Sequence, residues 1–190
     1  SVEELAQIML EDIAKGAKVI GEIGTSKNEW TNDEHKVFEA TVIAQKKTNV
    51  VIITHTTLGT LIREQVDFFL ENGINPKKVI ISHVALSNDL DAIRYALQKG
   101  FNVAFDTIGK TKYLPDETRV QFMKTLIQEG HMHQLLMSMD ITRQSHLKKN
   151  GGVGYTYLLD TFIPMLEQAG ISEDTITTIT SKNFTEILEA

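Results

Sequence analysis

Five short apolar runs occur along this chain, and each of them ends in an acidic residue or a histidine. The runs are residues 19–22, 50–55, 79–83, 102–106 and 135–140. Near-continuous runs of Val, Ile, Leu and Phe are typical of parallel strands that helices cover. Such a strand has no packing reason to finish so regularly in a polar side chain, and α/β proteins place their chemistry at the carboxyl ends of parallel strands. The pattern therefore predicts a parallel sheet with a functional site at one edge.

Stretches with helical periodicity lie between and around these runs. One of them opens with Thr31 and Glu34, the spacing of a capping box. The stretches predicted to be helical are residues 2–15, 31–46, 61–72, 87–99, 115–129 and 155–169. The order is therefore one helix followed by five strand–helix units, which indicates an α/β fold.

Two α/β architectures fit this order. A doubly wound sheet of five strands would be complete at 190 residues. A (βα)8 barrel normally needs about 250 residues and would lack three of its units here. The pattern of residues alone does not choose between them. No linker, low-complexity tract or shift in composition divides the chain, so we expect residues 1–190 to form a single domain.

The composition narrows the classes of function. The net charge is −6 and the chain has no basic run, so neither nucleic acid nor an anionic membrane is an expected partner. Cysteine is absent, which excludes disulfides, zinc–thiolate sites and a cysteine nucleophile, and agrees with the cytoplasmic location that we expect. No apolar stretch approaches the ~20 residues that a membrane-spanning helix needs.

Four of the residues that end the apolar runs form a candidate metal-binding set: Glu22, His55, His83 and Asp140. Two imidazoles and two carboxylates suit Zn²⁺ or a similar divalent transition metal, and a carboxylate can bridge two cations. A single histidine at a strand end is more often only hydrogen-bonded, but four such residues at matched positions predict a metal site. Asp106 ends the remaining run and either supports this site by holding one of its ligands or caps a helix.

The segment that follows Asp140 is basic and contains several glycines. Arg143 and His146 are candidates to bind the oxygens of a substrate or an anionic leaving group. An ordinary mobile surface loop explains the same composition equally well. No Gly-x-Ser-x-Gly elbow is present, which argues against a serine hydrolase.

Five short segments resemble one known family in both sequence and order. They are Gly-Glu-Ile-Gly-Thr-Ser at 21–26, Thr-His-Thr at 54–56, Ser-His-Val at 82–84, Phe-Asp-Thr-Ile-Gly-Lys at 105–110 and Ser-Met-Asp-Ile-Thr-Arg at 138–143. Along essentially its whole length the chain is similar to the phosphotriesterase family of the amidohydrolase superfamily, and within it to the branch of phosphotriesterase homology proteins.

The resemblance implies a (βα)8 TIM barrel of the metal-dependent hydrolase type, with two Zn²⁺ ions at its mouth. It implies that Glu22 bridges the two metals and that His55 and His83 bind the more exposed one. Asp140 would bind the buried metal and act as the catalytic base. The chain matches strands four to eight only, so the N-terminal strands and their His-x-His pair are expected to be absent from this incomplete barrel. We therefore expect one ion or none in this chain.

The function that the resemblance implies is hydrolysis in a catabolic process. A metal-bridging hydroxide would attack a small lactone, carboxyl ester or phosphoester, and Arg143 and His146 would bind the substrate. Glu22 stands where the best-studied hydrolases of the family have a carboxylated lysine, which favours a lactone or ester over a phosphotriester.

Two alternatives stay open. The chain could be a catalytically inactive fragment, or a non-enzymatic metal-binding or interaction module, of the same fold. Open edges of its sheet would then favour self-association, for example as a homodimer. It could also be a doubly wound ligand-binding domain, although it has no glycine fingerprint for a nucleotide.

Overall fold

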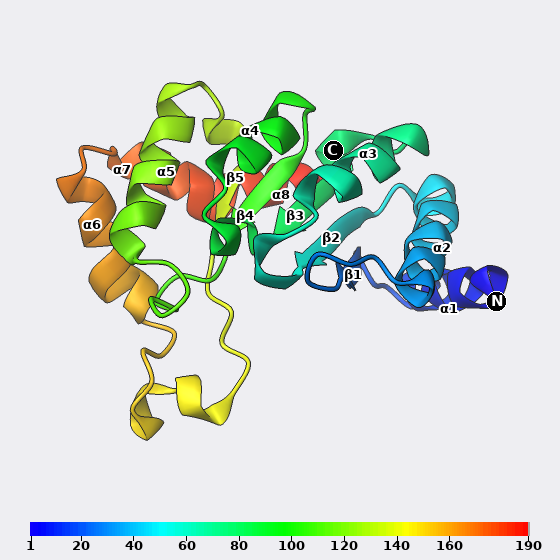
Figure 1. Cartoon of the computed structure of the whole chain (residues 1–190), viewed down its shortest axis with the longest axis horizontal. Helices are drawn as coiled ribbons and strands as arrows, with labels where there is room; N and C mark the ends of the chain where they lie inside the picture. The colour runs from blue at the N-terminus through cyan, green and yellow to red at the C-terminus, as the bar shows by residue number, and fades with distance from the viewer. Residues whose placement is uncertain (190) are drawn as a thin grey trace.

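The computed structural model describes residues 1–189, which contain a sheet of five parallel strands. The strands are β1 (Val19–Thr25), β2 (Val51–Thr56), β3 (Val79–Ser82), β4 (Asn102–Phe105) and β5 (Leu135–Met137). Each strand pairs in parallel with the next one in the chain, so the order across the sheet is β1-β2-β3-β4-β5 (Figure 1). The prediction of five parallel strands is confirmed.

The strand order decides between the two architectures. A doubly wound sheet reverses its order at a switch point, and no reversal occurs within residues 1–189. Consecutive order in one direction is that of a barrel segment, so the doubly wound alternative is wrong. The outer edges of β1 and β5 pair with no further strand of the described residues. Closure into a (βα)8 barrel therefore stays a prediction, as does the single domain over residues 1–190.

Helices follow the strands in the predicted alternation. They are α1 (Val2–Ala14), α2 (Asn32–Thr48), α3 (Ile62–Glu71), α4 (Leu90–Gln98), α5 (Asp116–Gln128), α6 (Ile163–Gln168), α7 (Glu173–Thr177) and α8 (Asn183–Glu189). Helix α2 begins with the predicted capping box, in which the Glu34 N–H donates to the Thr31 hydroxyl and the Thr31 N–H to the Glu34 carboxylate. Among residues 1–189, none of these helices is long and apolar enough to span a membrane.

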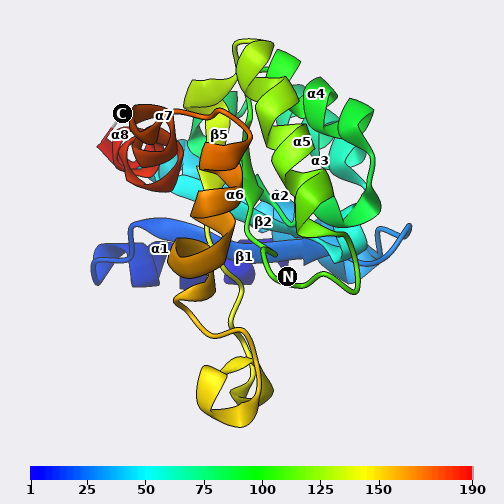
Figure 2. The ribbon, with the colours of Figure 1, turned by 90° about the vertical axis from the view of Figure 1, so that its left-hand side faces the viewer.

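Successive residues of each strand point to opposite faces of the sheet, and two apolar layers result. The larger layer joins the sheet to α2 through α7. Figure 2 shows α3, α4 and α5 together on this side of the sheet, and α8 on the other. The smaller layer lies on the opposite face and consists of Val51, Ile80, Ala104, Leu136 and Ile187.

Helix α8 covers the amino ends of the strands on that opposite face. The ammonium group of buried Lys78 donates to the carbonyl oxygen of Ile187 at 3.1 Å, and the Asn183 amide donates to the carbonyl of Leu135 at 2.7 Å. Towards the carboxyl ends of the strands this face is hollow, with a cavity of about 410 Å³. The predicted functional edge of the sheet therefore opens onto accessible space.

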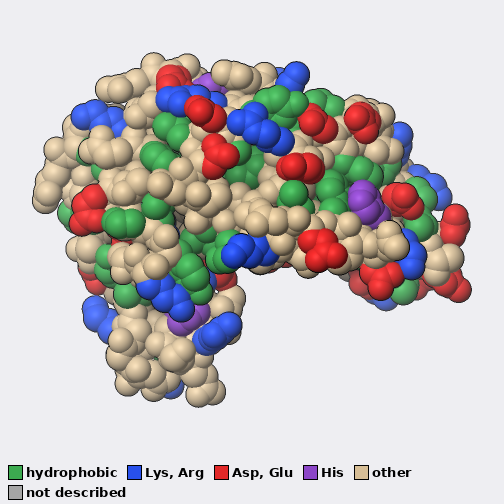
Figure 3. All heavy atoms as spheres, in the orientation of Figure 1, with side chains coloured by type: hydrophobic (Ala, Val, Ile, Leu, Met, Phe, Trp, Pro, Cys, Tyr) green, Lys and Arg blue, Asp and Glu red, His purple; other side chains and the backbone are tan. Residues whose placement is uncertain are grey.

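Residues 141–157 leave the sheet after β5 and project from the body of the molecule (yellow in Figure 1). They contain two short 3-10 turns, Gln144–His146 and Lys148–Asn150. A cleft of about 660 Å³ is lined by this segment and by residues that follow β2, β3 and β4. Figure 3 shows the surface hollowed beside the projection.

Candidate metal centre

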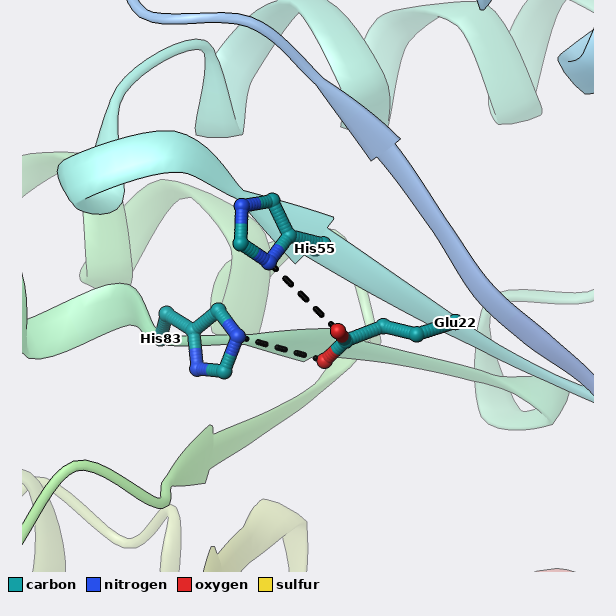
Figure 4. Close-up of side chains that lie close together, drawn as sticks. All are labelled: Glu22, His55 and His83. Carbon is teal, nitrogen blue, oxygen red and sulfur yellow. Dashed lines mark ion pairs between the residues drawn. The ribbon is translucent and has the colours of Figure 1, made fainter. Parts of the chain in front are cut away.

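Three of the predicted ligands meet near the carboxyl ends of β2 and β3, where Glu22 enters from the middle of β1. The Nε2 atom of His83 lies 3.2 Å from one oxygen of Glu22, and the Nδ1 atom of His55 lies 3.5 Å from the other. Each residue offers one ligand atom within 4.8 Å of the other two. In Figure 4 the two imidazoles approach the carboxylate from neighbouring elements, one to each oxygen. This donor set suits a divalent transition metal such as Zn²⁺.

Gly21 and Gly24 of β1 allow the close packing that positions Glu22 and His55. The pairing of β1 with β2 shifts register between Ile20 and Ile23, so Glu22 lies in a bulge, a device that redirects a side chain. Gly21 has φ +153°, and a Cβ atom there would lie 2.5 Å from the carbonyl oxygen of Ile53. A Cβ atom on Gly24 would lie 2.9 Å from the Cβ of His55. Both close approaches require glycine.

His83 is held in one orientation by Asp106. The side chain of His83 is buried, and its residue adopts a left-handed backbone conformation with φ 62°. One oxygen of Asp106 accepts from the backbone N–H of His83 at 3.0 Å and lies 2.9 Å from its Nδ1 atom. The Nε2 atom is thereby left to face Glu22. In metal sites, a carboxylate commonly binds the ring nitrogen of a histidine ligand that does not face the metal. Asp106 has this supporting position, which is one of the two roles that the sequence left open.

The charges of the cluster are strongly coupled. Hydrogen bonds with His55 and His83 lower the pKa of the Glu22 carboxyl to about 2. Burial disfavours the charged form of His83, but its hydrogen bonds with Asp106 and Glu22 outweigh burial and raise its pKa to about 10. At neutral pH a carboxylate anion thus faces a protonated imidazole, and a bound cation would replace that proton.

A buried glutamine behind His55 was not predicted to belong to the site. The Gln65 side chain, on α3, donates to the backbone carbonyl of His55 at 3.0 Å and to the Thr25 hydroxyl at 2.9 Å. It therefore joins the carboxyl ends of β1 and β2 directly behind the ligands. The signal in the sequence is a polar residue within the apolar stripe of a helix, which is costly to bury unless it is hydrogen-bonded.

Asp140 lies near this cluster but is not part of it. It follows β5 by three residues and pairs with the ammonium group of Lys110. It lines the 410 Å³ cavity together with Glu22 and His83, but the group of three mutually close ligands does not include it. Lys110 was not among the predicted site residues, although it belongs to one of the segments that resemble the family.

Arg143 and His146 both line the 660 Å³ cleft, together with His55 and His83. The cleft also carries Lys110. Figure 3 shows Lys or Arg and His side chains on the projection beside the hollow, and Lys or Arg at its upper edge. The lining includes three cationic side chains, from Lys110, Lys112 and Arg143, against the single carboxylate of Asp140. The predicted substrate residues therefore lie where a bound molecule would contact both them and the histidines.

The sequence profile of the Phosphotriesterase family matches residues 1–188. The chain belongs to this family. Its sequence is 42% identical over 190 residues to the phosphotriesterase homology protein of Escherichia coli (strain K12), covering 96% of this chain and 65% of that protein. The crystal structure of the Escherichia coli protein, complexed with phosphate in its active site, superposes with a TM-score of 0.95 at 41% identity, covering 99% of this chain and 67% of that one. Family membership confirms the resemblance found in the sequence.

Two further relatives of the family carry the names of hydrolases. The aryldialkylphosphatase of Saccharolobus solfataricus is 28% identical over 96% of this chain and 63% of that protein. The phospho-furanose lactonase of Mycoplasmopsis synoviae is 29% identical over 82% of this chain and 46% of that protein. The chain thus spans less than two thirds of the length of these curated relatives.

Proposed function

We propose that this chain carries the metal centre of a metal-dependent hydrolase that acts on a lactone, a carboxyl ester or a phosphoester. The observation that carries the proposal is the convergence of Glu22, His55 and His83 from three neighbouring elements, with Asp106 fixing His83 from behind. The hydrolase names of the family relatives support it.

Glu22, His55 and His83 would hold one Zn²⁺ ion, and Glu22 and Asp140 would supply ligands to a second. When bound, such cations supply Lewis-acid polarisation of the substrate's acceptor oxygen. Asp140 would accept the proton that the attacking water loses, since its carboxylate lines the inner cavity and the outer cleft alike. The ammonium group of Lys110 holds that carboxylate at the junction of the two spaces.

The charge of the cleft favours a small substrate that carries an anionic group. Lys110, Arg143 and His146 all line the cleft. Guanidinium and ammonium groups bind phosphate and carboxylate oxygens through charge-assisted hydrogen bonds. The phosphate in the active site of the Escherichia coli relative supports this assignment. A neutral phosphotriester would offer no anionic group to Arg143, so we favour a lactone or ester with a phosphate or carboxylate group.

The test compares zinc-loaded and metal-depleted protein on a panel of lactones and aryl esters, with and without a phosphate group. We expect hydrolysis that chelation abolishes and zinc restores, and at least a 100-fold loss of kcat/KM in His55→Ala. His133→Ala is the matched control, because His133 is exposed in the turn before β5, at the other end of the strand. A folded protein that retains no metal would contradict the proposal and favour the inactive or non-enzymatic alternative.

A further inference from the structure

A buried polar cluster behind the cleft takes no part in the proposed metal centre. Asp116 and Arg119 lie one turn apart on α5, 2% and 0% exposed, and their side chains form an ion pair at 2.7 Å. Tyr157 completes the cluster, since its hydroxyl donates to the Asp116 carboxylate at 2.9 Å. We refer to Asp116, Arg119 and Tyr157 as the clasp.

The clasp holds the backbone on both sides of Lys110. The Asp116 carboxylate accepts from the N–H of Gly109, with each oxygen at 3.2 Å. The Arg119 guanidinium donates to the carbonyl of Lys110 at 3.4 Å and also to the carbonyl of Leu114. The backbone before and after Lys110 is therefore hydrogen-bonded to a buried ion pair on α5.

Tyr157 brings the second wall of the cleft to the same carboxylate. It ends the projecting segment 141–157, and its ring lies so close to Gly109 that a Cβ atom there would be 3.1 Å from the ring. Burial and the Asp116 carboxylate raise the pKa of the Tyr157 hydroxyl to about 12, so it stays a hydrogen-bond donor at neutral pH. One buried carboxylate thus accepts from the segments that carry Lys110 and Arg143.

Stability of α5 alone does not account for this arrangement. An ion pair between residues three apart on a helix can form without help from either loop. Here the remaining acceptor positions of Asp116 are taken by two segments that both line the cleft. Hydrogen bonds to a buried charge are strong and directional, so movement of one segment disturbs the partners of the other.

We propose that Tyr157 is a positioning residue that, through Asp116, sets the spacing between Lys110 and Arg143 across the cleft. The coupling of the two segments follows from the clasp itself, whereas its effect on anion binding rests on the proposed function. The substrate class that this spacing selects is a small molecule with an anionic group held between the two cations.

The first experiment measures hydrogen–deuterium exchange of the metal-free chain. Tyr157→Phe keeps the ring and removes only the hydroxyl, so we expect exchange in residues 107–114 and 141–157 to rise together, by roughly 10-fold, while the strands are unchanged. Tyr155→Phe is the matched control, because Tyr155 is 66% exposed two residues away and its hydroxyl forms no hydrogen bond with the clasp. Equal exchange in the two variants, or a rise in one segment alone, would overturn the proposal.

The second experiment measures the affinity of the same proteins for inorganic phosphate. We expect Tyr157→Phe and Lys110→Met each to weaken binding by roughly 10-fold, and the double variant to lose less than the product of the two. If the loss of phosphate affinity in the double variant equals the product of the two single losses, Tyr157 does not act through Lys110, which would contradict the positioning role. If the parent chain binds no phosphate, the anionic substrate of the proposed function is refuted. The exchange result alone then tests whether the clasp couples the two segments.

Discussion

Histidine 83 shows how much of the candidate site a single residue can organise. Its ring connects the Asp106 carboxylate on one side with the Glu22 carboxylate on the other, at 2.9 and 3.2 Å. The sequence predicted His83 as a ligand from its position at the end of an apolar run. It did not decide the role of Asp106, because only the folded chain shows which of two neighbouring carboxylates lies behind the ring and which lies in front.

Metal binding should release a proton from His83. The pKa of this imidazole is raised to about 10 in the metal-free chain, so the ring carries a proton at pH 8 that a metal on Nε2 must displace. The apparent affinity for Zn²⁺ should therefore rise with pH, approaching 10-fold per unit, and level off above about pH 10.

Titration calorimetry of Zn²⁺ binding at pH 8, in buffers with different ionisation enthalpies, counts this proton. We expect about one proton per ion from His83, and fewer in Asp106→Asn, because that variant lacks the carboxylate that stabilises the imidazolium. Zinc binding at Glu22, His55 and His83 with no release of protons at pH 8 would show that His83 is neutral in the metal-free chain.

At the scale of elements, β1 is the strand most closely shaped by the site. It pairs with β2 on both sides of a register shift, and Gly24 lies directly opposite His55. The sequence predicted a strand that ends at Glu22, whereas β1 continues through Glu22 to Thr25. It gave no indication of the bulge, because a bulge depends on the neighbouring strand and the two strands are separated by a whole helix.

Gly24→Ala tests whether close packing of β1 on His55 is needed for the site. The added Cβ would lie 2.9 Å from the Cβ and 3.1 Å from the Cδ2 of His55, so His55 must shift from the position in which it faces Glu22. We expect at least a 10-fold loss of zinc affinity, measured by competition with a chelating dye, in a protein that keeps its fold.

Gly130→Ala is the matched control for this prediction. Gly130 follows α5 with φ +92° and open space around it, so alanine there strains the backbone far along the chain from the ligands. Both variants should unfold at a lower temperature, but only Gly24→Ala should lose zinc affinity. Equal zinc affinity in the two would mean that the position of His55 does not depend on Gly24.

The remaining elements divide into those that local patterns predict and those that they do not. The capping box of α2 and the five strands followed from neighbouring residues. The helix predicted from residue 87 begins instead at Leu90, because Asn88 adopts a left-handed conformation and Asp89 caps the helix. The order of the strands could not be predicted from the pattern of residues, since it depends on pairing between segments that lie far apart in the sequence.

At the scale of the whole molecule, the net charge of the chain and the charge of the cleft have opposite signs. The chain carries a net charge of −6, yet the lining of the cleft has three cationic side chains and one carboxylate. The absence of nucleic-acid and membrane partners, and a homodimer, stay predictions. Composition averages over the surface, whereas the fold brings Lys110 and Arg143 into one cleft from segments about thirty residues apart.

The central claim is that Glu22 of β1 forms a metal site with His55 and His83 from the carboxyl ends of β2 and β3. Crystals of the chain grown with Zn²⁺, with anomalous diffraction measured on both sides of the zinc absorption edge, test it most directly. We predict an anomalous peak about 2.0–2.2 Å from an oxygen of Glu22 and from one nitrogen each of His55 and His83. A map of zinc-saturated crystals with no peak among these three side chains would contradict the account.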